Sequence, residues 1–283
     1  FPAGAPAAAK LMQQTGVKKS YNPFFTPMAV ASWKPIAELL AANGIVRLGP
    51  DTTYALDMRR LLGVMRSGTR WKDLPHNAAY PVGKAVLVST TDVRTSNSAA
   101  MYLALTSYVL NGDNVVQNDA EITPLLPVLA ALIRKQGYQE SSSAGPFEDY
   151  LTMGMGKAPL VLIYEAQFIE QQVEHGSGNP DMVLLYPEPT VFTKHTLVPL
   201  SPRGDQLGQL LEGDTELQRL AAEYGLRTAD GAYGARLWAS KGVKVPAQLL
   251  DVVDPPSFEV LEHMITAVVR GAPCGPGADS TCR

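Results

Sequence analysis

The sequence predicts an α/β protein with mostly parallel sheets flanked by helices. Short apolar strand patterns alternate along the chain with longer helical patterns, and this alternation is typical of parallel strands joined by crossover helices. The 283 residues, of which 46% are hydrophobic, are enough to form two lobes or one large α/β unit.

Local sequence signals predict the helices and strands in the first half of the chain. Pro35 in the first turn and Gly44 at the end delimit a helix over residues 34–44, and Pro27 marks a kink or an edge in the strand before it. In order, we expect a turn and helix in 1–20, a strand at 24–33, helices at 34–44 and 52–68, a buried strand at 83–90 and a helix at 98–112.

The second half continues the alternation. The uninterrupted apolar run at 160–164 is typical of a central strand. In order, we expect a helix at 123–137, a strand at 160–164, a helix at 165–176, strands at 181–187 and 190–201, and helices at 204–213, 214–226, 233–242 and 257–271.

Charge and hydropathy exclude several classes of partner. The net charge is −3, and no cluster of Lys and Arg exceeds two neighbours, as in Lys18-Lys19. A nucleic-acid backbone or an anionic membrane surface requires a basic face, so neither is expected as a partner. No apolar run approaches the length of a membrane span.

A polar loop between the predicted strand at 83–90 and the helix at 98–112 is the first candidate site. A strand followed by a polar loop and a helix start is where α/β folds bind anions, through free N–H groups and the helix dipole. We expect the ligand-facing residues of this loop to be Asp92, Arg94, Ser96, Asn97 and Ser98. The alternative is a capped helix with a solvated Arg–Asp pair.

A second strand end brings in Tyr164 and Glu165, which follow the run "LVLIY" at a helix start. The carboxyl ends of parallel strands face the same crevice, so these residues and the polar loop are expected to meet across one ligand. The alternative is an aromatic side chain packed on the sheet and an ordinary acidic helix start.

Motifs for catalysis, metals and cofactors are missing from the sequence. The four histidines, at positions 76, 175, 195 and 263, lack metal-ligand spacing, and no G-x-S-x-G, P-loop or G-x-G-x-x-G motif occurs. We therefore expect a binding protein without a cofactor or metal rather than an enzyme.

The two cysteines, Cys274 and Cys282, lie eight residues apart across Gly-Pro-Gly near the C-terminus. We expect them to form a disulfide, which would fit an exported protein. The alternative is a pair of free thiols. A metal site would need more ligands than this stretch offers.

Three stretches resemble the type 2 periplasmic solute-binding proteins of ABC transporters, in the molybdate/sulfate-like branch. They are "WKDLPHNAAYPVGKAVLVSTTDVRTSNSAAMYLAL", "APLVLIYEAQF", which is similar to the family's strand ending in a ligand-facing Tyr, and the return strand "TVFTKHTLVPLS". The resemblance implies a two-lobed fold that closes on a solute about a hinge. It places lobe 2 at 80–188 and lobe 1 at 1–79 and 189–283. The chain itself suggests crossings between the lobes near 70–85 and near 186–192.

The resemblance also implies a periplasmic or extracellular protein that captures a small oxyanion or organic anion and delivers it to a membrane transporter. Because the chain begins at Phe1, we expect that the family's first strands, which carry half of the anion site, precede it. The alternative functions are a ligand-sensing or interaction module on the same fold and, less favoured, an enzyme.

Overall fold

The computed structural model describes residues 4–49, 51–176, 179–246, 248–249 and 251–270. Its helices are α1 (Ala5–Thr15), α2 (Lys34–Ala42), α3 (Met58–Arg66), α4 (Asn97–Leu110), α5 (Asp119–Arg134), α6 (Ala144–Met153), α7 (Glu165–His175), α8 (Pro202–Gly213), α9 (Thr215–Glu223), α10 (Gly231–Ser240) and α11 (Phe258–Arg270). Its strands are β1 (Tyr21–Trp33), β2 (Val46–Leu48), β3 (Tyr54–Asp57), β4 (Leu160–Tyr164), β5 (Met182–Glu188), β6 (Thr190–Leu197) and β7 (Val252–Val253).

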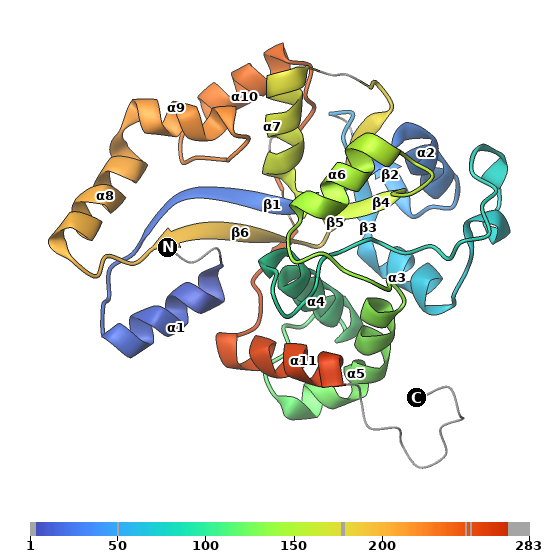
Figure 1. The fold of residues 1–283 in the computed structure, drawn as a ribbon, viewed down its shortest axis with the longest axis horizontal. Coiled ribbons are helices and arrows are strands. Elements are labelled where there is room, and N and C mark those ends of the chain that lie inside the picture. Colours follow the sequence, from blue (N-terminus) through green and yellow to red (C-terminus); the bar gives the residue numbers. More distant parts are fainter. Residues whose placement is uncertain (1–3, 50, 177–178, 247, 250, 271–283) are drawn as a thin grey trace.

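The long strand β1 organises the sheet. Its first half pairs with β6, and its second half pairs with β4 and with β5. The strand order is β2-β3-β5-β1-β6-β7, with β4 also joined to β1. Helices α7, α9 and α10 lie on one side of the β1–β6 ribbon, and α4, α5 and α11 on the other (Figure 1). A mixed α/β fold with a curled sheet flanked by helices is therefore confirmed.

The orientation of the strands corrects the prediction of mostly parallel sheets. Among the described strands, β1 runs antiparallel to β4, β5 and β6, as does β2 to β3; the parallel pairs are β3 with β5 and β6 with β7. Alternation of strands and helices predicts parallel pairing when successive strands are neighbours. Here the partners of β1 come from the distant second half of the chain.

Two predicted elements also differ. Residues 83–90 form only isolated bridges, from Ala85 to Arg70 and from Ser89 to Val161, because the segment follows β4 only briefly. The predicted helix at 52–68 begins as strand β3, and only Met58–Arg66 is helical. The Asp57 carboxylate accepts a hydrogen bond from Arg60 N and starts α3 there.

The hydrophobic core surrounds α4. Every residue from Ser98 to Ser107 is buried, so this helix is covered on all sides. A smaller cluster of Ile169, Ala222, Trp238 and Val243 lies apart from the main core and joins α7 to α9 and α10. None of the described helices combines the length and the apolar character that crossing a membrane requires.

Candidate functional site

The polar loop leaves the edge of β4 and turns into α4. Ser89 N donates to Leu160 O and Leu162 N donates to Ser89 O, both at 2.9 Å, which aligns the loop with the strand. The Asp92 carbonyl then accepts hydrogen bonds from Thr95 N at 3.2 Å and Ser96 N at 3.0 Å. This turn places the N-terminus of α4 beside the end of β4.

Arg94 and Asp92 form an ion pair within this loop. Arg94 Nε lies 2.9 and 3.0 Å from the two carboxylate oxygens of Asp92, and Arg94 Nη2 also donates to Oδ2. The guanidinium holds the pKa of Asp92 below its ordinary value. The Arg94 side chain is 63% exposed and that of Asp92 is 17% exposed. Asp92 therefore orients an arginine whose outer edge faces solvent.

The hydroxyl groups at the start of α4 bond to one another. The Ser98 hydroxyl lies 2.9 Å from both the Thr91 hydroxyl and the Ser96 hydroxyl. Ser96 is the N-cap residue, yet its side chain makes no capping hydrogen bond to the helix. The first N–H groups of α4 are therefore not satisfied by the N-cap side chain.

Asn97 and Tyr164, which were expected to face one ligand, contact each other directly. Asn97 Nδ2 donates to the Tyr164 hydroxyl at 3.1 Å and links the start of α4 to the end of β4. Burial raises the pKa of Tyr164, and the nearby Asn97 amide and Thr193 hydroxyl oppose that rise. Thr193 is only 1% exposed, and its Oγ1 makes no hydrogen bond of acceptable geometry.

Thr193 was missed by the sequence prediction, because a threonine in a strand carries no signal of its own. Buried hydroxyls almost always have a partner. The Thr193 hydroxyl lies near the Tyr164 hydroxyl and acts on its pKa, but the pair does not meet the geometric criteria of a hydrogen bond.

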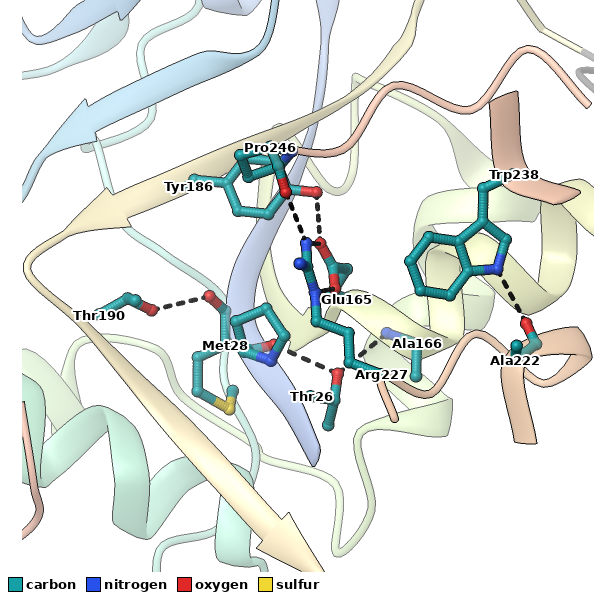
Figure 2. Close-up of polar contacts among 11 residues, drawn as sticks. Thr26, Met28, Glu165, Ala166, Tyr186, Thr190, Ala222, Arg227, Trp238 and Pro246 are labelled. Carbon is teal, nitrogen blue, oxygen red and sulfur yellow. Dashed lines mark hydrogen bonds and ion pairs between the residues drawn. The ribbon is translucent and has the colours of Figure 1, made fainter. Parts of the chain in front are cut away.

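Glu165 lies in a separate, buried cluster (Figure 2). Its carboxylate is 0% exposed and accepts from Arg227 Nε at 2.6 Å, from Arg227 Nη2 at 2.8 Å and from the Tyr186 hydroxyl at 2.7 Å. Burial and the carboxylate raise the pKa of Tyr186 well above its ordinary value. Arg227 Nη2 also donates to Pro246 O at 3.1 Å. In this structure Glu165 thus joins α7 to the C-terminal region.

A small cavity lies at the N-terminus of α4. It measures about 190 Å³, and we name it the α4 cavity. Its wall includes Gly4, Pro6, Arg94, Ser96, Asn97 and Phe258. A Cβ atom added at Gly4 would lie 3.0 Å from Asn97 Oδ1, so the start of α1 packs closely over the predicted site.

Cys274 and Cys282 lie outside the described residues. Within the described part of the chain, no group of three or more His, Cys, Asp or Glu side chains could hold a metal ion. Of the histidines, His195 lies on β6 with its ring edge-on to Phe24 at 6.5 Å, and burial lowers its pKa.

Comparison with known proteins gives distant structural neighbours. No family model matches the chain, and no curated protein matches it. The chain is similar to the sulfate-binding protein SubI from Mycobacterium tuberculosis H37Rv, with 14% identity and a TM-score of 0.45 over 87% of this chain and 72% of that one. It is also similar to a Streptococcus pneumoniae solute-binding protein in complex with the blood group A-trisaccharide. That match has 13% identity and a TM-score of 0.45 over 92% of this chain and 67% of that one. Similarity at this level assigns no ligand to the chain.

Proposed function

We propose that the chain is an exported solute-binding protein that captures a small anionic solute and delivers it to a membrane transporter. The observation that carries the proposal is the cluster of Asn97, Tyr164 and the unpartnered Thr193 hydroxyl at the N-terminus of the buried helix α4. Free N–H groups, the positive end of the helix dipole and neutral donors together favour an anion. The resemblance of residues 71–105 and 158–168 to type 2 periplasmic binding proteins supports the same function.

The proposal keeps two lobes, 80–188 and the combination of 1–79 with 189–283, with the solute held between them. The α4 cavity of about 190 Å³ is smaller than the roughly 300–1,000 Å³ of common ligand pockets. Its wall comes from both proposed lobes: Arg94, Ser96 and Asn97 belong to lobe 2, and Gly4, Pro6 and Phe258 belong to lobe 1.

The test is calorimetric titration with sulfate, molybdate and succinate, which represent inorganic oxyanions and an organic anion. Thr193→Val removes the hydroxyl while keeping the shape of the side chain. We expect about ten-fold weaker anion binding, since one hydrogen bond to a charged group is lost. The unliganded protein should keep or gain stability, because a buried group without a partner is removed.

Arg94→Ala should weaken binding by about ten- to a hundred-fold, because a charge-assisted contact is lost. The melting temperature of the unliganded protein should barely move. Arg59→Ala is the matched control, because Arg59 is also exposed and paired with an aspartate, Asp113. If no anion binds, or if Thr193→Val and Arg94→Ala bind as tightly as the wild type, the proposed site is wrong.

Export is tested separately through the cysteines. We propose a disulfide between Cys274 and Cys282, as expected for a protein of an oxidising compartment. Mass spectrometry of the unreduced protein should show the loss of two hydrogen atoms and no alkylation at either position. Two freely alkylating thiols would contradict the disulfide.

A further inference from the structure

We propose that a hollow beside α10 is a second ligand site, for a small neutral molecule with an apolar body and one hydrogen-bond acceptor. The hollow measures about 530 Å³ and lies within the size range of common ligand pockets. We name it the α10 pocket and define it by six lining residues: Arg227, Gly231, Ala232, Ala235, Trp238 and Val245.

Most of the wall of the α10 pocket is made of small and apolar side chains; its polar members are Asp51, Arg227, Thr228 and Lys244. A Cβ atom added at Gly231 would meet no atom within 4 Å, so open space lies directly in front of the helix start. Trp238 is held in place because its Nε1 donates to Ala222 O at 2.8 Å. A ligand with an apolar body would gain by displacing water from these walls.

Arg227 supplies the polar anchor. Its Nε and Nη2 atoms are bonded to Glu165 and Pro246 (Figure 2). Among the described residues, no hydrogen bond is made by Nη1. An arginine carries five N–H donors, and the two on Nη1 remain for a ligand. The side chain is only 13% exposed, so a hydrogen bond made there would be shielded from water.

The charges around the pocket indicate a neutral ligand. The Glu165 carboxylate already neutralises the Arg227 guanidinium. Asp51 and Lys244 also line the pocket; both are exposed and carry opposite charges. The pocket therefore offers a donor without net positive charge, which suits a carbonyl or hydroxyl oxygen better than a carboxylate. It shares no lining residue with the α4 cavity.

The experiment follows the indole N–H signals of the full chain by ¹⁵N NMR during titration with acetophenone. The chain has three tryptophans, so the Trp238 signal is assigned by its loss in Trp238→Phe, and Trp33 and Trp71 serve as internal references. We expect a saturable shift of the Trp238 signal alone. Ethylbenzene, which has a similar shape but no acceptor, should bind about ten-fold more weakly. Benzoate should bind no more tightly than acetophenone.

Two variants test the location. Gly231→Leu fills the pocket and should abolish the Trp238 shift. Ala232→Leu, on the same wall, should do the same if the first variant folds poorly. Gly63→Leu is the matched control, because Gly63 is also an exposed helical glycine with nothing within 4 Å of its added Cβ. An unmoved Trp238 signal, equal binding of ethylbenzene, tighter binding of benzoate than of acetophenone, or unchanged titration of both filling variants would overturn the proposal.

Discussion

The ion pair between Glu165 and Arg227 is the most buried charge interaction described in the protein, with 0% and 13% of the two side chains exposed. Burial alone would lower the pKa of Arg227, but the hydrogen-bonded carboxylate raises it. Both oxygens of Glu165 are occupied by donors. Such a pair adds little stability over an apolar core, yet removing one charge leaves the other buried without compensation.

Glu165→Gln should therefore lower the free energy of unfolding by about 3–5 kcal/mol, the range seen when a buried pair is broken. Urea unfolding monitored by circular dichroism would measure it. The control is Glu188→Gln, since Glu188 pairs with Arg47 at 2.6 Å on the surface, with side chains 45% and 63% exposed. It should cost less than about 1 kcal/mol. If both variants lost the same free energy of unfolding, burial would not explain the cost of breaking the Glu165–Arg227 pair.

His195 makes the stability of the folded protein depend on pH, with stability decreasing as the pH falls. Burial lowers its folded-state pKa below the ordinary value of 6.5. As the pH falls through 6.5, the unfolded chain takes up the proton before the folded protein does, so stability decreases until the folded-state pKa is passed. Thermal melts from pH 8 to pH 5 should show this decrease. Its size should shrink in His195→Gln, and an unchanged profile in that variant would contradict the assignment.

At the scale of elements, Gly225 determines how closely the turn after α9 approaches α7. Its φ is +74°, and an added Cβ would lie 2.4 Å from Ala166 O and 2.9 Å from Ala166 Cα. No side chain fits there without moving the backbone of α7. The small core cluster of Ile169, Ala222, Trp238 and Val243 depends on this approach.

Gly225→Ala should lower the free energy of unfolding for two reasons, the left-handed backbone and the overpacking against α7. Gly242→Ala carries only the first of these costs. Gly242 has nearly the same φ, +75°, but nothing within 4 Å of its added Cβ. Gly242→Ala should lose about 1 kcal/mol from the left-handed backbone alone. Gly225→Ala should lose a further 1–3 kcal/mol or so from overpacking. Denaturant unfolding of both variants measures the difference. Equal losses of stability would show that α7 shifts to accommodate the methyl group at position 225 with no further loss of stability.

Local signals predicted most elements, because they act within a few residues. Pro35 and the apolar spacing that follows it gave α2, and the run "LVLIY" gave β4 at its observed bounds. The sequence also predicted that the polar loop and Tyr164 face one ligand; their direct hydrogen bond through Asn97 was not predicted. Strand orientation was not accessible, because it depends on pairing between segments far apart in the chain.

Arg227 could not be predicted as the partner of Glu165, because this contact too joins segments far apart in the chain. Arg227 lies 62 residues further along the chain and follows a helix with no motif around it. The resulting ion pair depends on the packing of the C-terminal segment against β1, where Phe25 and Arg227 exchange backbone hydrogen bonds of 2.9 Å. Sequence periodicity reports which side of an element is apolar, but not which distant charge will meet it.

At the scale of the whole molecule, β1 holds the sheet together. Val30 and Ala31, in its second half, pair with both β4 and β5 and are 1% and 0% exposed. Helix α1, by contrast, has Ala8 as its buried residue, and Lys10 joins it to Glu259 on the surface at 2.6 Å. Different parts of the protein should therefore open with different free energies.

Amide hydrogen exchange followed by mass spectrometry should show this order. The amides of Val30 and Ala31 should exchange only on global unfolding and be the slowest in the protein. Those of α1 should exchange much faster, because an isolated helix of 11 residues is marginal without packing. Comparable protection of α1 and β1 would contradict this picture.

The pairing of β1 also has a consequence for synthesis of the chain. Thr190 Oγ1 donates to the carbonyl of Met28 across a separation of 162 residues. On a ribosome, the apolar strand β1 emerges long before β4, β5 or β6 exists to cover it. At about 5–20 residues per second, the nascent chain exposes this strand for roughly ten seconds or more. During that interval β1 has no partner strand, and the completed sheet can form only when β6 has left the exit tunnel.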